Sequence, residues 1–450
     1  MDDFEKTYDL IVIGTGNAGT AMSLEARHAG WRVAIVDELP FGGTCALRGC
    51  IPKKVLVGAA DVIIRTKFMR NKGLDGDIRI KWPELMSFKR TFTDPIPLTR
   101  SRTYAERGLD AYSGHARFLG RNTLQVGDKT LTARFIGITT GAVPRRLGIP
   151  GERFASSSDD FLAMKENPNR IIFIGGGIIS FEFAHVAASA GATVTILHRS
   201  DRVLKNFDPF LVDILVKSFM KSGVEIRTNM PVKSIEKAPD RLLVHAGKEE
   251  DIIFEADMVV HGAGRVPNIE SLDLKAGEVS VDERGIVINQ YLQSVSNPSV
   301  YVAGDANARG KPLTPAARMD GKKAAENMIG GNGLTTDYGA VPSVEFTFPL
   351  LASVGCNEED AEKCLPNLMV HKRETSDWYS SRRIGIAHSG YKIITEGQSG
   401  RIIGAHLLGY NADETINLFA LAIKEGIELA DLQEVAWAYP TAAYDINRIL

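Results

Sequence analysis

The hydrophobic pattern near the start of the chain predicts a strand, a helix and a second strand in close succession. Leu10–Ile13 is a short apolar run, mostly β-branched, which is typical of a buried parallel strand. A helical stretch covers Thr20–Ala29, Gly30 ends it, and a second apolar run covers Arg32–Val36. This order predicts a βαβ unit in a parallel sheet.

Glycines mark the turn between the first strand and the helix. Gly14, Gly16 and Gly19 have the spacing G-x-G-x-x-G. In that motif the first glycine permits the tight turn, the second lets the backbone approach a pyrophosphate, and the third allows close helix–strand packing. Asp37 ends the second strand, where a carboxylate can accept hydrogen bonds from ribose hydroxyls. We therefore expect a dinucleotide at the N-terminus of this helix.

The same pattern recurs between Asn169 and Asp208, with Gly175 and Gly177 between a strand and a helix. Two such units in one chain predict two dinucleotides, an electron donor and an acceptor. Strand-and-turn segments at residues 135–151 and 256–268 lead into and out of the second unit. The second unit is therefore expected to be inserted into the first.

The pattern changes from about Asp337 onwards, where no third nucleotide motif occurs in the sequence. Short strands and one long helix are expected there instead: Ser343–Phe348, Tyr391–Thr395, Ile402–Leu408 and the helix Glu414–Gly426. This predicts a separate C-terminal α+β domain.

Composition and charge narrow the class of protein. The chain has 450 residues, 44% hydrophobic and 24% charged, an ordinary globular balance with room for several domains. A formal net charge of -2 gives no global basic field for nucleic acid or an anionic membrane. No apolar run approaches the roughly 18 residues of a membrane span. The acidic N-terminus lacks a signal peptide, so a cytoplasmic location is expected.

Candidate chemistry is concentrated in FGGTCALRGCIPKK, residues 41–54, which contains Cys45 and Cys50. With only 4 cysteines the chain is no disulfide scaffold. In a reducing compartment a close pair indicates redox chemistry or metal binding rather than a structural bridge. Structural zinc needs two more ligands, and no CxxC or HxxH partner is present. Cys356 and Cys364 are scattered and are interpreted as ordinary thiols.

Together these motifs resemble those of the glutathione reductase-like group of flavin-dependent pyridine nucleotide–disulfide oxidoreductases. The match covers nearly the whole chain and follows the family order. Its parts are Gly42-Gly43-Thr44-Cys45, Gly49-Cys50-Ile51-Pro52-Lys53-Lys54, Thr140-Gly141-Ala142-x-Pro144, Gly264-Arg265-x-Pro267-Asn268 and Ala303-Gly304-Asp305.

The resemblance implies an α/β fold with two Rossmann-like dinucleotide-binding domains, the second inserted in the first, and a C-terminal α+β dimerisation domain. The FAD-binding domain is expected over residues 1–145 and 265–336, the NAD(P)-binding domain over 146–264, and the interface domain over 337–450. A homodimer with shared active sites is also implied.

The resemblance further implies which residues act. Cys50 would face the flavin and Cys45 would attack the substrate, while Lys53 would pair with Glu182 beside the flavin ring. Lys53 and a helix N-terminus expected after Pro52 are candidates to stabilise the thiolate. The implied cofactor-binding residues are Gly14, Gly16, Gly19, Asp37, Gly43, Thr44, Lys53, Ala116, Thr140, Gly141, Asp305, Thr314, Gly175, Gly177, Ile179, Arg199, Lys205 and Gly264.

The second unit indicates which nicotinamide cofactor is used. Its strand Val194–Leu197 runs into His198 and Arg199 and carries no acid at its end, whereas an NAD site usually has one. Ser180 replaces the third glycine, as in NADP-type units of the family. Alignment with NADPH-using members places Arg199 and Lys205 against the 2′-phosphate. A solvated basic turn is the alternative, and NADPH is the expected cofactor.

The C-terminus departs from the family pattern. Where the family ends in His-Pro-Thr-x-x-Glu, this chain has Tyr439-Pro440-Thr441-Ala442-Ala443-Tyr444. The family's histidine shuttles protons in the other subunit's active site, whereas a phenol with a pKa near 10 is a poor base at neutral pH. Mercuric reductases share the tyrosine but end in a vicinal cysteine pair, and this chain ends in DINRIL. Tyr439 either takes over part of the role or only packs at the dimer interface.

The expected function is transfer of electrons from NADPH through FAD and a Cys45–Cys50 disulfide to a small disulfide. Reduction of a thiophilic metal ion or a quinone is the alternative. Lipoamide dehydrogenase is disfavoured by the missing His–Glu pair, and a non-turnover redox sensor is disfavoured by the intact cysteine frame. Basic residues such as Arg27 and Lys322 could attract a glutathione-like carboxylate or could be solvated surface charges.

Overall fold

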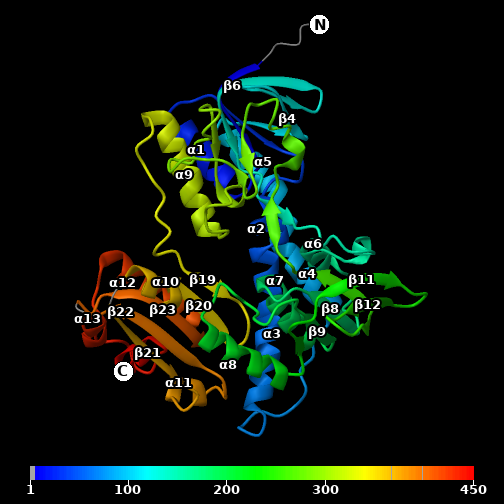
Figure 1. Ribbon diagram of the computed structural model, residues 1–450, viewed down its shortest axis with the longest axis vertical. Coiled ribbons are helices and arrows are strands. Elements are labelled where there is room, and N and C mark those ends of the chain that lie inside the picture. Colours follow the sequence, from blue (N-terminus) through cyan, green and yellow to red (C-terminus); the bar gives the residue numbers. More distant parts are fainter. Residues whose placement is uncertain (1–5, 366, 398, 450) are drawn as a thin grey trace. The chain divides into compact units, whose positions relative to one another are not determined.

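The computed structural model describes residues 6–365, 367–397 and 399–449, which divide between two structural units. The first unit takes its residues from 1–53, 88–145 and 265–338. The second unit takes them from 54–87, 146–264 and 339–450. Helices α3 (Cys50–Met69) and α4 (Trp82–Thr93) contribute residues to both. Each unit is described below by itself (Figure 1).

In the described part of the first unit, a seven-stranded sheet forms the centre, with strand order β3-β2-β1-β6-β5-β4 and β18 paired to β6. Strands β3, β2, β1, β6 and β18 are parallel, and β5 and β4 add an antiparallel edge. Leu10, Ile11 and Val12 are 0% exposed because apolar groups cover both faces of the sheet. The strands are β1 (Lys6–Ile13), β2 (Val33–Asp37), β3 (Asp110–Ser113), β4 (Ala116–Gly120), β5 (Thr123–Val126), β6 (Lys129–Ile138) and β18 (Val300–Val302).

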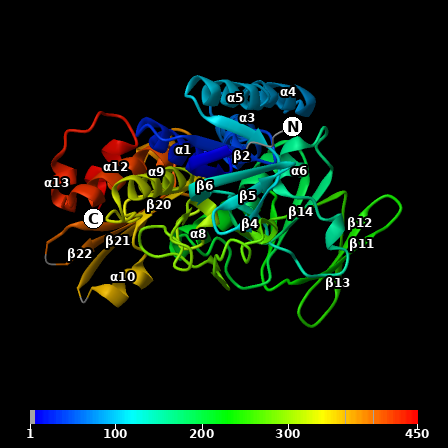
Figure 2. The same ribbon diagram turned by 90° about the horizontal axis from the view of Figure 1, so that it is seen from above.

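Two helices lie side by side on this sheet, α1 (Asn17–His28) and α9 (Thr314–Gly330) (Figures 1 and 2). Their close approach depends on Gly321, where a Cβ atom would lie 2.2 Å from the Ala18 carbonyl oxygen. Helices α2 (Gly43–Arg48) and α5 (Ile96–Glu106) complete the helical part of the unit. Its short elements are β7 (Ala142–Pro144), β15 (Arg265–Pro267), β16 (Val281–Asp282), β17 (Gly285–Ile286), and the 3₁₀ turns η2 (Glu270–Leu272) and η3 (Gly304–Ala306).

The second unit contains another parallel sheet, of strand order β10-β9-β8-β14. An antiparallel sheet of strand order β11-β12-β13 accompanies it. Helix α8 is capped by Asp208, whose side chain accepts from the N–H groups of Phe210 and Leu211, and begins with Pro209. The elements are η1 (Glu152–Phe154), α6 (Ser158–Ala163), β8 (Arg170–Ile174), α7 (Ile178–Ser189), β9 (Thr193–Leu197), α8 (Pro209–Lys221), β10 (Glu225–Arg227), β11 (Val232–Lys237), β12 (Leu242–Ala246), β13 (Ile252–Ala256) and β14 (Met258–His261).

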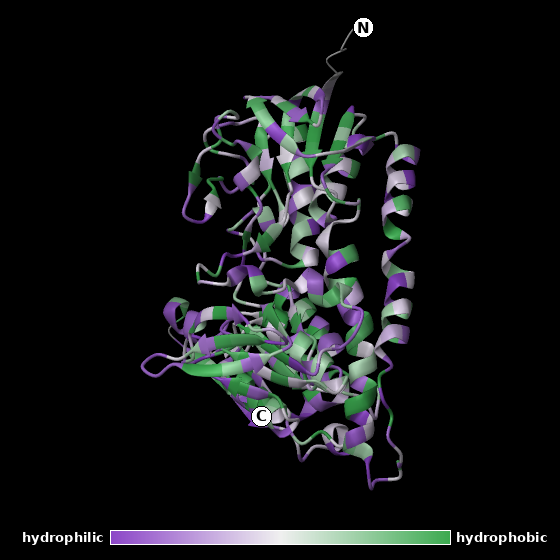
Figure 3. Ribbon diagram, turned by 90° about the vertical axis from the view of Figure 1, so that its right-hand side faces the viewer, coloured by the Kyte–Doolittle hydropathy of each residue, from purple (hydrophilic) through white to green (hydrophobic). Residues whose placement is uncertain are grey.

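The C-terminal part of this unit is built on an antiparallel sheet of strand order β19-β20-β23-β22-β21. Phe173 of β8 and Leu351 of β20 belong to one hydrophobic core, which joins this sheet to the parallel one. Hydrophobic residues are concentrated along the buried strands and helix faces (Figure 3). The elements are β19 (Ser343–Glu345), β20 (Leu350–Gly355), α10 (Glu358–Cys364), β21 (Leu368–Glu374), α11 (Tyr379–Arg382), β22 (Gly390–Glu396), β23 (Ile402–Gly409), α12 (Ala412–Glu425), α13 (Leu429–Glu434) and η4 (Ala443–Arg448).

The expected α/β architecture is confirmed, including both βαβ units and the C-terminal α+β part. Several expected boundaries were wrong. The helix expected from Thr20 begins at Asn17, and the helix expected from Glu414 begins at Ala412. The helix expected to begin after Pro52 begins at Cys50, because proline is tolerated in the first helical turn. The strand expected over Ser343–Phe348 ends at Glu345, before the cis Phe348–Pro349 peptide bond. None of the described helices is both long and apolar enough to cross a bilayer.

Candidate functional site

The first glycine-rich turn leaves no room for side chains at its two ends. Gly14 has φ +109°, and a Cβ atom there would lie 2.4 Å from the Thr139 carbonyl oxygen. A Cβ atom at Gly19 would lie 2.0 Å from the Gly14 carbonyl oxygen. The Thr139 hydroxyl donates to the Ile13 carbonyl at 2.8 Å and so links the ends of the adjacent strands β1 and β6. The turn therefore has the tight geometry that a pyrophosphate-binding turn requires.

The middle of the same turn is open and carries the cysteine segment. A Cβ atom added at Gly16 would meet no other atom within 4 Å, so a ligand can approach the Gly16 backbone. A Cβ atom at Gly43 would lie 2.5 Å from the Gly16 Cα, so α2 begins directly against the turn. The Asp37 carboxylate accepts from the Thr15 N–H at 2.8 Å, and the Thr15 hydroxyl accepts from the Gly42 N–H at 3.0 Å. The dinucleotide turn and the cysteine segment are thus in direct contact, so the position of one fixes the position of the other.

Other predicted cofactor residues of the first unit have mixed surroundings. The buried Thr140 hydroxyl has no hydrogen-bond partner among the described residues, which is the signature of a group that a ligand satisfies. Gly141 has φ +70°, as a turn glycine requires. Burial raises the pKa of Asp305, which the Arg265 charge partly offsets. Ala116 is a core residue of β4, so only its backbone is available to a ligand. The open Gly16 turn and the orphaned Thr140 hydroxyl fit a dinucleotide such as FAD.

The two cysteines lie together at the end of this cradle. Cys45 lies in the short helix α2, and Cys50 is the first residue of α3. The Thr314 hydroxyl, at the start of α9, is 3.2 Å from the Cys45 Sγ and 3.5 Å from the Cys50 Sγ. Both cysteines are thiols in this structure. No cluster of three or more metal-binding side chains occurs among the described residues.

The pKa of the Cys45 thiol is raised by its surroundings. A hydrogen bond with Cys50, then burial, raises the pKa of the Cys45 thiol, and the Thr314 and Asn17 side chains oppose this by hydrogen bonding to the sulfur. Asn17 was not among the predicted site residues, since it belongs to no cysteine motif.

The predicted Lys53–Glu182 pair falls in different units. Lys53 belongs to the first turn of α3 and is 9% exposed. Glu182 lies on α7 and is 4% exposed, and its carboxylate accepts from the Phe346 N–H at 2.9 Å. Both are buried charged groups, which the interior tolerates only with partners. Their mutual pairing stays a prediction.

The second glycine-rich turn repeats the geometry of the first. Gly175 has φ +102°, and a Cβ atom there would lie 2.6 Å from the Gly262 carbonyl oxygen. Gly177 is more open, with only that oxygen at 3.5 Å. Ser180 is 0% exposed and fills the place of the third glycine by packing against Gly262. Ile179 is half-buried at the start of α7, and Gly264 has φ +109°. The turn again leaves its backbone available to a pyrophosphate.

A basic turn follows strand β9, and His198 shapes it. The His198 Nδ1 accepts from the Gly176 N–H at 2.9 Å, and its Nε2 donates to the Arg202 carbonyl at 2.8 Å. Burial, and then the charges of Lys205 and Arg199, lower the pKa of His198 while the Arg202 carbonyl raises it. Arg199 and Lys205 are both exposed on this turn. Sequence reasoning noted His198 only as part of a basic run and missed that it ties the turn to the glycines.

The C-terminal tyrosines lie together. The Tyr439 side chain is 66% exposed, and its ring meets the Tyr444 ring edge-on at 4.8 Å between centroids. The Tyr439–Pro440 peptide bond is cis. Within the described chain Tyr439 is thus a surface group supported by a second phenol.

A basic hollow of about 770 Å³ opens beside α1 in the first unit. Arg27 and Lys322, predicted as substrate-attracting groups, both line it. Asn17 lines it as well, and the Asn17 side chain lies close enough to the Cys45 sulfur to lower the pKa of that thiol. Its remaining lining residues are Thr20, Ala21, Leu24, Glu25, His28, Arg100, Arg107 and Arg318. Arg100 and Arg318 were not predicted, because they lie on separate helices with no shared sequence motif.

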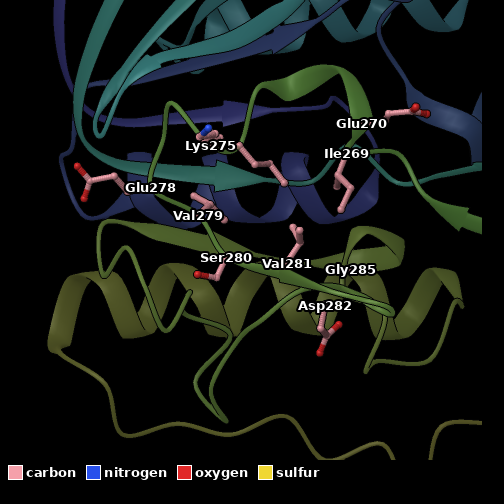
Figure 4. A pocket seen from close by; sticks show the side chains of 10 residues that line it. Ile269, Glu270, Lys275, Glu278, Val279, Ser280, Val281, Asp282 and Gly285 are labelled. Atoms are coloured by element: carbon pink, nitrogen blue, oxygen red, sulfur yellow. The ribbon is translucent and has the colours of Figure 1, made fainter.

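A second hollow of about 620 Å³ lies on another part of the same unit. Ile269, Leu274 and Val279 line it together with charged residues such as Glu270 and Glu278. The carboxylates of Glu270 and Glu278 point in opposite directions (Figure 4). It therefore offers no converging polar groups of the kind that orient a ligand.

Comparison with known proteins agrees with this site. Residues 8–321 match the pyridine nucleotide-disulphide oxidoreductase family, and residues 341–448 match the dimerisation domain of that family. The chain is 32% identical to a glutathione reductase from Burkholderia cepacia, over 97% of both proteins. It is 30% identical to a mercuric reductase from Bacillus cereus, over 98% of this chain and 71% of that protein.

A solved structure has the same fold along the whole chain. It is the Cu(II) complex of RclA, an HOCl-induced flavoprotein disulfide reductase from Escherichia coli. Its TM-score is 0.88 with 25% sequence identity, and the match covers 99% of each chain. This fold thus combines two glycine-rich dinucleotide turns, two cysteines five residues apart and a C-terminal dimerisation domain. The chain belongs to the pyridine nucleotide–disulfide oxidoreductase family.

Proposed function

We propose that this flavin-dependent disulfide reductase passes electrons from NADPH through Cys45 and Cys50 to a small disulfide. The observation that carries the proposal is the position of Cys45. Its sulfur shares a hydrogen bond with Cys50 and lies next to Asn17, at one end of the basic hollow. Asn17 also lines the hollow, so an acceptor bound there would lie near the Cys45 sulfur.

The chain's own residues would hold both cofactors. The turn at Gly14, Gly16 and Gly19, with Thr140 and Asp305, would hold FAD, and the turn at Gly175 and Gly177 would hold NADPH. When bound, FAD supplies the transfer of an electron pair from NADPH to the cysteine disulfide. Lys53 and Glu182 are proposed to form a buried ion pair beside it.

Exchange at the cysteines balances in two steps. The Cys45 thiolate attacks one sulfur of the acceptor RSSR, forming a mixed disulfide and releasing RS⁻. The Cys50 thiolate then attacks the Cys45 sulfur, releasing the second RS⁻ and restoring the Cys45–Cys50 disulfide. Both leaving thiolates take up protons, so one disulfide and one NADPH with a proton give two thiols and NADP⁺.

Proton handling at Cys45 differs from that in family members with a histidine. The Thr314 hydroxyl can donate to the Cys45 thiolate, and Asn17 supplies a second neutral donor. In a homodimer Tyr439 would complete the partner's site as a hydrogen-bond donor to the leaving thiolate. These groups stabilise anions but do not remove protons.

Reduction of a thiophilic metal ion is the second candidate. It is favoured by the relationship to mercuric reductases and by the pair of soft sulfur ligands at Cys45 and Cys50. It needs no long binding groove, whereas this chain has a large basic hollow beside the thiols. The disulfide is therefore the preferred acceptor.

The test is NADPH oxidation by the FAD-loaded enzyme with glutathione disulfide, and in parallel with Hg(II) plus excess thiol. We expect the wild-type enzyme to turn over glutathione disulfide. The Cys45→Ser variant should lose this turnover but bind FAD as the wild type does. Turnover with the metal ion alone would transfer the assignment to metal reduction. Absence of turnover with both acceptors, in an enzyme whose FAD is reduced by NADPH, would contradict the proposal.

A further inference from the structure

The basic hollow lies along two helices that both begin beside Cys45. Helix α1 starts with Asn17, whose side chain acts on the Cys45 sulfur to lower its pKa, and helix α9 starts with Thr314, whose hydroxyl is 3.2 Å from the same sulfur. Both helices therefore leave Cys45 in the same direction, from their N-termini towards their C-termini.

The lining residues follow one stripe on each helix. On α9, Arg318 and Lys322 are four and eight residues beyond Thr314. They therefore lie on the same face of the helix as Thr314, about 6 and 12 Å along the helix axis. On α1, Arg27 is ten residues beyond Asn17, about 15 Å along the axis. The positive charge is thus farther from the sulfur than the polar groups that contact the sulfur.

The charge in the hollow is strongly one-sided. Arg27, Arg100, Arg107, Arg318 and Lys322 line it, and Glu25 is the only carboxylate among its lining residues. Lys322 has Glu326 at 3.7 Å, whereas Arg100, Arg107 and Arg318 have no ion-pair partner in the part of the chain described here. His28 adds a further nitrogen donor.

One of the arginines is fixed in position. The Arg27 Nε donates to the Arg107 carbonyl at 3.1 Å, and its Nη1 donates to the Trp31 carbonyl at 3.4 Å. A Cβ atom at Gly108 would lie 2.9 Å from the Arg27 Nη2, so the glycine makes room for the Arg27 guanidinium. An arginine held by carbonyls rather than by a carboxylate keeps its full charge for a ligand.

The position of the charge distinguishes between possible disulfides. In glutathione disulfide the carboxylates are within about two residue lengths of a sulfur, about 7 Å. Arg318, about 6 Å along α9, is within that reach, whereas Lys322 and Arg27, about 12 to 15 Å along their helices, match an arm of about four residue lengths. The guanidinium forks of Arg100, Arg107 and Arg318 favour phosphate, which can accept two parallel hydrogen bonds from one guanidinium.

We propose that the acceptor is a disulfide whose sulfur is carried on a long arm ending in phosphate groups. The arm lies between α1 and α9, and the phosphates bind Arg27, Arg318 and Lys322 with Arg100 and Arg107. This inference rests on the proposed disulfide reductase function and specifies its substrate class.

The kinetic test compares coenzyme A disulfide with pantethine, which has a similar arm without the nucleotide and its phosphates, and with glutathione disulfide. We expect kcat/KM for coenzyme A disulfide to exceed that for pantethine by at least about tenfold, and the advantage to shrink at high salt. The double variant Arg318→Ala/Lys322→Ala should lose the advantage and keep its rate with pantethine. Lys323→Ala is the matched control, because Lys323 pairs with Glu326 at 3.0 Å and lies outside the hollow.

A binding measurement separates this inference from the proposed function. Coenzyme A is titrated calorimetrically into the FAD-loaded enzyme with saturating NADP⁺, which fills the other nucleotide site. Binding that is lost in the double variant and kept in Lys323→Ala supports the hollow as the phosphate site, even if no disulfide is reduced. Equal rates for coenzyme A disulfide and pantethine, or coenzyme A binding unchanged in the double variant, would overturn the inference. Turnover of glutathione disulfide alone would do the same and leave the reductase function intact.

Discussion

Cys45 holds its proton more tightly than an isolated thiol because of its neighbour. The hydrogen bond from Cys45 to Cys50 is the largest cause of the raised Cys45 pKa, followed by burial and by the Cys50 charge. Two of these three causes disappear if Cys50 is replaced. The residue that raises the pKa of the attacking thiol is thus the same one that later attacks the Cys45 sulfur and releases the substrate thiolate.

We therefore expect Cys50→Ser to lower the pKa of Cys45 and to increase its thiolate fraction at neutral pH. The measurement is the rate of iodoacetamide alkylation at Cys45 in the reduced enzyme, from about pH 6 to about pH 9, around the usual thiol range. The rising limb of the profile should move to lower pH. Cys364→Ser is the control, since Cys364 is an exposed thiol outside the pair. A Cys45 profile that stays in place would show that Cys50 does not raise the pKa of Cys45.

Arg199 is proposed to bind the 2′-phosphate of NADPH from the basic turn after β9. Removal of one charge-assisted hydrogen bond corresponds to about 10- to 150-fold in binding. We expect Arg199→Ala to raise the KM for NADPH by about this factor and to leave the KM for NADH nearly unchanged. Steady-state kinetics with both cofactors is the measurement. Equal effects on the two cofactors would assign Arg199 a general structural role.

At the scale of elements, a buried ion cluster joins the start of α8 to the antiparallel sheet of the second unit. The Lys392 Nζ on β22 is 2.6 Å from the Asp208 carboxylate and 2.6 Å from the Glu358 carboxylate. The Lys392 and Asp208 side chains are only 3% and 1% exposed. Asp208 also caps α8. Burial opposes the charged lysine, but the two carboxylates outweigh it, so the pKa of Lys392 is raised.

Lys392→Met should destabilise the second unit by about 3–5 kcal/mol, because it leaves the Asp208 carboxylate buried without its partner. The measurement is the urea unfolding midpoint of the FAD-loaded enzyme. Lys363→Met is the matched control, since Lys363 pairs with exposed Glu359 and Asp360 and should cost no more than about 1 kcal/mol. Similar midpoints for the two variants would contradict a stabilising role for the buried cluster.

The same cluster makes the stability of the second unit depend on pH. Hydrogen bonding to Lys392 is the main cause that lowers the pKa of Glu358. A carboxylate whose folded-state pKa is depressed stabilises the fold above its unfolded-state pKa and loses that contribution as the pH falls through the folded value. The protection from Glu358 is therefore present at neutral pH and lost in acid.

At the scale of the whole molecule, the dimerisation domain leaves apolar groups uncovered in a single chain. Leu421 on α12 and Met369 on β21 are 57% and 52% exposed, and Tyr439 is 66% exposed. Contiguous burial of such groups is what a homodimer interface supplies. We propose a homodimer in which the Tyr439 segment of each chain completes the active site of its partner.

Light scattering of the FAD-loaded enzyme should therefore give twice the 49.0 kDa chain mass. Disulfide reductase activity per chain should fall on dilution in step with dissociation, because each site would lose its second half. An active species of the single-chain mass would contradict the shared site.

Sequence reasoning located the parts of the site that are local in the chain. The glycine turns and the cysteine pair follow from spacing within a few residues, because a tight turn or a short redox loop has few solutions. Asn17, Arg100 and Arg318 could not be found in this way. They meet only because α1, α5 and α9 are brought together by the fold, and a single arginine on each helix carries no signal of its own. His198 was visible as a residue but not as the anchor of the basic turn.

Thr314 has a consequence for the timing of the exchange reaction. A hydroxyl carries one hydrogen, and the Thr314 oxygen lies within reach of both sulfurs, at 3.2 Å from Cys45 and 3.5 Å from Cys50. It can therefore stabilise only one anion at a time. While the hydrogen points to Cys45, Cys50 is the less shielded sulfur, and rotation about a single bond reverses the order. A side-chain rotor of this kind selects which of two adjacent nucleophiles is exposed, without any movement of the backbone.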